Sequence, residues 1–163
     1  MMMDEKRHVR IREHVHKHDG VINQIEFQFT EDSSGDDKLE RYYSLWLTRD
    51  HYNKAIRHFR QLDPLTFQEY IDTLRPLIAG HCCQENELRR AFAIIDENRS
   101  GAIEVQELYN FVGIIGRSTT EEKLLQFIER VSQVPGQMDY NEFKHFVRLG
   151  HGREMLVHIS MEQ

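Results

Sequence analysis

The feature that most constrains this chain is the stretch DENRSGAIEVQE at residues 96–107. Side chains that carry oxygen recur at alternate positions along it, and Gly101 stands at the sixth position. Glycine adopts positive φ angles at no steric cost, so the backbone can turn sharply there. A chain that turns this tightly directs its alternate side chains toward a common centre. The spacing therefore predicts a loop that wraps around an ion.

The pattern suits calcium, which takes about six to eight hard oxygen ligands at about 2.3–2.6 Å. Such a loop supplies side-chain oxygens at positions 1, 3 and 5, a backbone carbonyl at position 7, and a water-bridging residue at position 9. Position 12 needs a long carboxylate that reaches back with both oxygens from the start of the next helix, and glutamate has the required length. The predicted ligands are Asp96, Asn98, Ser100, the Ala102 carbonyl, Glu104 through water, and Glu107.

Apolar residues continue the pattern on both sides of the loop. They recur at helical spacing before it, fill its eighth position, and recur again after it: Leu88, Phe92, Ile95, Ile103, Leu108, Phe111 and Val112. Over residues 84–149 the sequence resembles the EF-hand, calmodulin-like calcium-binding superfamily. The resemblance implies two helix–loop–helix units whose loops pair through a short two-stranded contact.

The partner loop expected from this resemblance is VSQVPGQMDYNE at residues 131–142. It keeps the glycine, the apolar eighth position and the last two carboxylates, which are Gly136, Met138, Asp139 and Glu142. Positions 1, 3 and 5 are instead Val131, Gln133 and Pro135. Two carboxylates alone do not offset the dehydration of calcium. We predict a degenerate loop that is retained for packing and paired with the first through Ile103 and Met138.

The predicted fold class is α+β and mainly helical. Residues 1–48 alternate apolar and polar side chains with period two, which predicts an N-terminal antiparallel β-meander of three strands. Residues 49–82 change to helical spacing and fit either a helical hairpin or a degenerate EF-hand. The EF-hand pair follows at residues 83–149. Residues 150–163 form a C-terminal tail that is either another strand or a segment docked on the helices.

Local signals predict some boundaries within these parts. Asp19-Gly20 is typical of a two-residue hairpin turn between the first strands. Pro76 predicts a kink or an end in a helix, because proline lacks the backbone N–H. Ser118 or Thr119, followed three residues later by glutamate, predicts a capping box at the start of a later helix.

A row of histidines marks the first predicted strand. His14, His16 and His18 alternate along it, a spacing at which two side chains can share a zinc or nickel ion. Arg10 and Arg12 extend the same face, which favours a solvated basic face over a metal site. Such a face would bind an acidic partner more tightly below about pH 6.5.

Composition limits the other function classes. The 163 residues carry a net charge of −6, which disfavours general binding to nucleic acid or anionic membranes. No apolar run approaches the length of about 20 residues that a transmembrane segment needs. The cysteines, Cys82 and Cys83, are adjacent and indicate a reducing compartment, so we expect a cytoplasmic protein. No nucleophile elbow or glycine-rich phosphate loop occurs, so we do not expect an enzyme.

The sequence thus predicts a calcium-binding regulatory or adaptor protein with one working loop, which Mg²⁺ can also occupy at rest. Movement of Glu107 onto the ion would pull the following helix. That helix would then expose Phe111, Ile114 and Ile115 to an amphipathic helix of a protein partner. The alternative is a constitutive protein-interaction module in which the EF-hand pair is structural and does not switch.

Overall fold

A computed structural model of the chain describes residues 11–18, 21–32, 40–59, 65–80, 83–115 and 119–161. The predicted Asp19-Gly20 turn and Cys82 fall outside these ranges. By its contacts the chain divides into two compact units, Met1–Asp50 and His51–Gln163. The first unit contains a β-sheet, and the second contains the helices.

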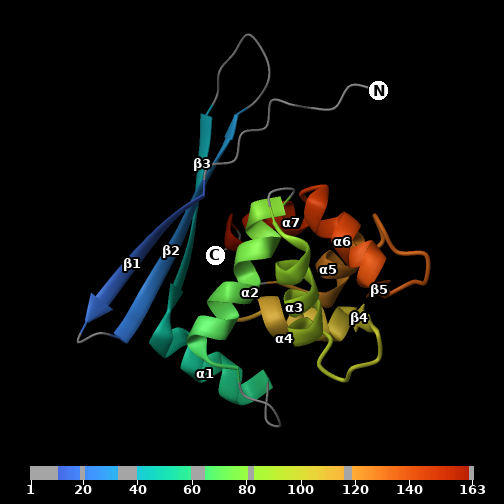
Figure 1. Cartoon of the computed structure of the whole chain (residues 1–163), viewed down its shortest axis with the longest axis horizontal. Helices are drawn as coiled ribbons and strands as arrows, with labels where there is room; N and C mark the ends of the chain where they lie inside the picture. Colours follow the sequence, from blue (N-terminus) through green and yellow to red (C-terminus); the bar gives the residue numbers. More distant parts are fainter. Residues whose placement is uncertain are drawn as a thin grey trace. The chain divides into compact units, whose positions relative to one another are not determined.

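The first unit is built on an antiparallel sheet of three strands in the order β1-β2-β3. β1 spans Ile11–His18, β2 spans Val21–Asp32 and β3 spans Glu40–Thr48. Consecutive strands are neighbours, so this is the β-meander that the alternation predicts (Figure 1). The role of the histidine row stays a prediction, because its side chains lie outside the described part of β1: His14, His16 and His18.

Strand alternation gives β2 and β3 one apolar face, because successive side chains point to opposite sides of a sheet. The register pairs Phe27 with Leu45 and Ile25 with Leu47, and all four side chains are buried. Trp46 lies between the two leucines of β3 and is 47% exposed. The two faces of these strands therefore differ as the period-two pattern indicates.

The second unit contains a bundle of helices and a short second sheet (Figure 1). In chain order the helices are α1 Arg49–Phe59, α2 Phe67–Ala79, α3 Glu85–Ile95, α4 Val105–Val112, α5 Glu121–Ile128, α6 Tyr140–Arg148 and α7 His151–Met161. Strands β4 (Ala102–Glu104) and β5 (Gln137–Asp139) pair antiparallel. Sheets combined with a majority of helix agree with the predicted α+β class. Within the described ranges, none of the helices has the length and apolar character to cross a bilayer.

α1 and α2 lie in the segment for which the sequence fits either a helical hairpin or a degenerate EF-hand. Residues 60–64 lie between them and outside the described ranges, so this choice is not tested. α2 begins with a capping box, in which Glu69 N donates to Thr66 Oγ1 at 3.1 Å and Thr66 N donates to Glu69 Oε2 at 3.0 Å. α2 then continues past Pro76, so an end at that residue is wrong. The helix stops instead before Gly80, whose φ is 64°.

The start of α5 also differs in detail from the predicted capping box. Its cap is Thr120, whose Oγ1 accepts a hydrogen bond from Lys123 N at 3.3 Å. The predicted Thr119 is therefore not the cap, and Ser118 lies outside the described residues. Three neighbouring residues carry a hydroxyl that can cap a helix, and spacing alone does not distinguish them.

The C-terminal tail is a helix rather than a strand. α7 buries Met155, Leu156 and Ile159 and contacts α2, α5 and α6. Gly152 allows this close approach, because a Cβ atom there would lie 3.2 Å from the backbone oxygen of Leu77 in α2. Of the two alternatives for the tail, the docked segment is correct and the strand is wrong.

α2 contacts α3, α6 and α7 within the helical unit (Figure 1). A helix that is apolar on most sides must be buried on most sides. Burial of a large apolar side chain contributes about 1.5–3 kcal/mol, so α2 anchors the packing of the unit. Its buried apolar residues are Phe67, Tyr70, Ile71, Leu74, Leu77 and Ile78.

Candidate metal centre

The loop at residues 96–107 joins α3 to α4 (Figure 1). Arg99 has a φ of 56° and Gly101 a φ of 89°, so the chain takes two left-handed steps within a few residues. No atom lies within 4 Å of the place that a Cβ on Gly101 would occupy. Glycine is therefore favoured there by its backbone angle and not by lack of space. The two steps curl the loop as the predicted ion site requires.

Asp96 places a carboxylate inside this curl, and its side chain is only 5% exposed. Oδ1 accepts a hydrogen bond from Ser100 N at 3.1 Å, and Oδ2 accepts one from Gly101 N at 2.9 Å. Ser100 Oγ also lies 3.3 Å from Oδ1. Hydrogen bonds from the fifth and sixth loop positions thus fix the carboxylate of the first position.

Neutral oxygens follow one another along the more exposed part of the loop. Asn98 Oδ1 accepts a hydrogen bond from Ser100 N at 3.0 Å. Ser100 Oγ donates to the Ala102 carbonyl oxygen at 2.9 Å. Positions 3, 5 and 7 therefore bring an amide, a hydroxyl and a carbonyl oxygen into one short arc.

Glu107 closes the loop from the first turn of α4. Its Oε1 accepts a hydrogen bond from Asn98 N at 3.1 Å, and its Oε2 accepts one from Glu104 N at 2.9 Å. Burial is the main reason that the pKa of Glu107 is raised. The two backbone N–H donors oppose this rise, and the negative charges of Asp96 and Glu104 add to it. A nearby cation would favour the ionised form of such a carboxyl.

This donor set fits a hard divalent cation. Asp96 and Glu107 supply carboxylates, Glu104 a third, and the remaining predicted donors are neutral oxygens. In the part of the chain that the structure describes, no three His, Cys, Asp or Glu side chains gather into a metal cluster by themselves. A site here therefore depends on amide, hydroxyl and carbonyl oxygens as well. Such a mixture suits calcium, whereas zinc prefers nitrogen and sulfur ligands.

The second loop, residues 131–142 between α5 and α6, is closed in the same way. Glu142 Oε1 accepts a hydrogen bond from Gln133 N at 2.9 Å, and its Oε2 accepts one from Asp139 N at 2.8 Å. The first position is Val131, whose side chain offers no oxygen. This loop therefore keeps the closing carboxylate and lacks the central one.

A two-stranded contact joins the loops. Ile103 in β4 lies opposite Met138 in β5, and both side chains are fully buried. Val105 N donates to Gly136 O at 3.0 Å just beyond the pair. The pairing is the one expected from the sequence, and it couples the backbone of the first loop directly to that of the second.

The residues expected to form a groove are covered in this structure. Phe111, Ile114 and Ile115 are all buried. Tyr70 of α2 covers Phe111, with ring centroids 4.6 Å apart and a hydrogen bond of 2.5 Å from the Tyr70 hydroxyl to Phe111 O. Sequence reasoning misses this contact because Tyr70 reads as one apolar position among several on its helix, and no local signal links it to a partner 41 residues away.

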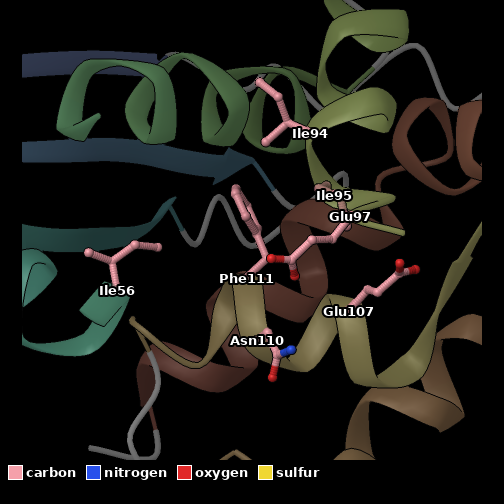
Figure 2. Close-up of a pocket in the computed structure, with 7 residues that line it drawn as sticks. All are labelled: Ile56, Ile94, Ile95, Glu97, Glu107, Asn110 and Phe111. Carbon is pink, nitrogen blue, oxygen red and sulfur yellow. The ribbon is translucent and has the colours of Figure 1, made fainter. Parts of the chain in front are cut away.

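A small cavity lies beside Glu107 at the junction of α1, α3 and α4 (Figure 2). It leaves about 10 Å³ for the centre of a water-sized sphere, which is room for about one water molecule. Figure 2 shows the Glu107 side chain turned away from Phe111. The volume is far below that of a substrate pocket, about 300–1,000 Å³. The lining residues are Ile56, Ile94, Ile95, Glu97, Glu107, Asn110 and Phe111.

Comparison with known proteins identifies the helix–loop–helix region. Residues 85–148 match the family described as an EF-hand domain pair. The flagellar outer-arm dynein 18 kDa light chain of Chlamydomonas reinhardtii is 38% identical over 61 residues. Two proteins of Oryza sativa subsp. japonica are also similar: the probable calcium-binding protein CML13, 34% identical over 65 residues, and the putative calmodulin-like protein 6, 38% identical over 61 residues.

These matches cover a limited part of each protein. The aligned segments make up 37%, 39% and 37% of this chain and 37%, 38% and 36% of the three relatives in the order given. The chain thus matches less than half the length of the curated relatives. The matched family is an EF-hand domain pair, which agrees with the expectation that the chain is not an enzyme. Loop geometry, loop pairing and family match agree that residues 85–148 are an EF-hand pair.

Proposed function

We propose that this chain is a calcium-responsive regulatory or adaptor protein with a single working site at residues 96–107. The supporting observation is the pair of buried carboxylates of Asp96 and Glu107. Burial is the main cause of the raised pKa of Glu107, and the negative charge of Asp96 adds to it. A divalent cation would relieve that repulsion. The proposed ligands are Asp96, Asn98, Ser100, the Ala102 carbonyl, Glu104 through a water molecule, and Glu107.

The second loop supports a single site rather than two. Val131 and Pro135 provide no side-chain oxygen at the first and fifth positions, and Gln133 is a neutral ligand at the third. Asp139 and Glu142 are already engaged with each other through a capping box, in which Glu142 N donates to Asp139 Oδ1 at 2.9 Å. We propose that this loop acts by packing.

Glu107 links the ion site to the rest of the fold. Glu107 would hold Ca²⁺ with both oxygens of its carboxylate, because the ion would supply the positive charge that they lack. Glu107 lies in the first turn of α4, so its displacement would move the whole helix. Phe111, which stands one turn after Glu107, would move with it. Once Phe111, Ile114 and Ile115 leave their internal contacts, they offer an apolar surface to an amphipathic helix of a protein partner.

Affinity in this proposal lies in the range of calcium sensors, with a dissociation constant of about 10⁻⁷–10⁻⁵ M. Mg²⁺ would occupy the same oxygens at rest, since both ions are hard cations. A cytoplasmic location fits the buried free thiol of Cys83, whose Sγ donates to Gly80 O at 2.7 Å. Free thiols persist in reducing compartments.

A second candidate function is a constitutive protein-interaction module in which the EF-hand pair is a structural clamp. The observation in its favour is that the pair already packs against helices of its own chain. Tyr70 of α2 covers Phe111, and α7 contacts α5 and α6. In this case calcium would stabilise the fold without opening a new surface.

Calorimetry tests the single site. Wild type should release or absorb heat as calcium is added, and Glu107→Gln should lose that heat at micromolar calcium because one anionic oxygen is removed from the ion. Glu142→Gln is the matched control, since it makes the same change at the same position of the second loop and should keep wild-type affinity. Equal heats from wild type and Glu107→Gln would contradict the proposed site.

Hydrophobic-dye fluorescence separates the two candidate functions. A switching protein should bind more dye in calcium than in chelator, because buried side chains become accessible. A clamp should show the same fluorescence in both solutions and only a higher melting temperature in calcium.

A further inference from the structure

We propose that the movement of the calcium loop is received by α1, through a contiguous set of aromatic rings formed by Phe111, Tyr70 and Tyr52. The inference rests on the proposed function, because it begins with Glu107 acting on α4. It adds the destination of the movement, which is the helix that directly follows strand β3 in the chain.

The first step joins α4 to α2. The Tyr70 hydroxyl donates to the backbone oxygen of Phe111 at 2.5 Å, and the two rings lie 4.6 Å apart. Phe111 stands one helical turn after Glu107, so the two residues move with the same helix. Tyr70 is fully buried, and a buried hydroxyl that loses its acceptor carries the full desolvation penalty. When Phe111 leaves this contact, as the proposed function requires, the Tyr70 hydroxyl loses its acceptor and α2 must repack around the Tyr70 side chain.

The second step joins α2 to α1. The Tyr52 ring lies 5.4 Å from the Tyr70 ring and 5.5 Å from the Phe67 ring, where it packs edge-on. The Tyr52 hydroxyl donates to the backbone oxygen of Leu65, just before α2. Tyr52 thus holds both the start of α2 and the segment that leads into it. Displacement of α2 changes all of these contacts together.

The cavity beside Glu107 gives the movement room. Ile56 of α1 and Phe111 of α4 line it together with Glu107 (Figure 2). The void at this junction is where α4 can begin to move without a steric clash. The close-packed rings of Phe111, Tyr70 and Tyr52 then pass the displacement on to α1. Coupling between sites travels through packed side chains of this kind when both sites bias the same element.

An NMR calcium titration of the full chain tests the proposal. In wild type, amide shifts should change in the calcium loop, in α2 and in α1 around Tyr52, all saturating together. In Tyr70→Leu, which removes the ring and its hydroxyl, the loop should still respond and the response of α1 should be lost. In Tyr52→Leu, the loop and α2 should respond and α1 should not. Tyr52→Leu also keeps the test decisive if Tyr70→Leu does not fold.

Phe143→Leu is the matched control. Phe143 is an equally buried aromatic residue in α6 that contacts Phe92 in α3, away from the Tyr70 contacts. Its replacement removes a similar amount of packing and should leave the response of α1 at wild-type size.

The outcomes separate this inference from the function on which it rests. Absence of any calcium response in wild type overturns the single-site function and this inference with it. A saturating loop response without change in α1 overturns the inference alone. A response of α1 at wild-type size in Tyr52→Leu and in folded Tyr70→Leu also overturns it.

Discussion

The two loops of the EF-hand pair share the same backbone hydrogen bonds and differ in the side chains of their first five positions. In both, the carboxylate at the twelfth position accepts hydrogen bonds from the backbone N–H groups of the third and ninth positions. In both, a glycine with positive φ stands at the sixth position. The closing residues are Glu107 in the first loop and Glu142 in the second.

The difference lies in the first five positions. Asp96 places a carboxylate at the first position of the first loop, whereas Val131 leaves the first position of the second loop without a side-chain oxygen. Arg99 is the non-glycine residue with positive φ in the described part of the chain. Its counterpart Val134 precedes Pro135, and a residue before proline is biased to extended conformations. The two loops therefore share one backbone frame, although only the first has a carboxylate at its first position.

Transfer of the first five positions should produce the largest effect. Replacing residues 131–135 with the DENRS of residues 96–100 gives the second loop the missing oxygens and removes the proline. We expect a second calcium ion to bind with a dissociation constant near the micromolar range, worth about 8 kcal/mol. Calorimetric stoichiometry measures this directly. A stoichiometry that stays at the wild-type value would show that the two loops differ in more than these positions.

Breaking the contact between the loops should have the next largest effect. Ile103→Asp or Met138→Asp places an unpaired charge at a fully buried position. The free energy of unfolding should fall by about 3–5 kcal/mol in either variant. Urea denaturation in chelator measures it, with Val134→Asp as an exposed control in the second loop. If the control loses as much stability as the buried variants, the contact is not what holds the loops together.

The two glycines provide a matched pair. Gly101→Ala and Gly136→Ala both force a side chain onto positive φ without a steric neighbour. Each should lower the free energy of unfolding in chelator by about 1–2 kcal/mol. Calcium affinity should fall only in Gly101→Ala, because strain at this positive φ would displace the N–H that holds the Asp96 carboxylate, and the second loop has no proposed ion. An equal loss of calcium affinity in both variants would contradict the assignment of separate roles.

Local pattern accounts for much of the fold and of the candidate site. Alternation predicts the meander, and oxygen spacing predicts the curled loop, because both depend on residues close in sequence. The contacts that sequence reasoning misses join distant helices. Glu85 in α3 accepts a hydrogen bond from the Tyr140 hydroxyl at 2.6 Å and pairs with Lys144 at 2.9 Å in α6. These contacts lower the pKa of Glu85 to about 2, led by the Tyr140 hydrogen bond.

The sequence does not predict the helical tail or the contact between Tyr70 and Phe111, because both depend on tertiary packing. Met155 and Ile159 fit a strand and a helix equally well by spacing, and packing on α2 decides between them. Tyr70 gains its partner only through the tertiary fold. Periodicity shows which face of a helix or strand is apolar, but it does not show which apolar residues contact one another.

The smallest effect concerns the pH dependence of the calcium-free protein. The pKa of Glu107 is raised in the folded state, chiefly by burial. Its contribution to stability is therefore complete below the unfolded pKa of about 4.3 and is lost as pH rises through the folded pKa. The stability of wild type minus that of Glu107→Gln should fall as the pH rises above about 4 in chelator. A difference that rises over this range would contradict the assigned direction.

The central claim is that one loop binds calcium while the other only supports it. The most direct test is a calcium titration that follows the backbone amides of Gly101 and Gly136 by NMR. The account predicts that calcium binds as one ion per chain, that the Gly101 amide moves with saturation because its N–H bonds to Asp96, and that Glu107→Gln abolishes the change. A Gly101 amide that stays in place at millimolar calcium, or a Gly136 amide that titrates with a second ion, would contradict it.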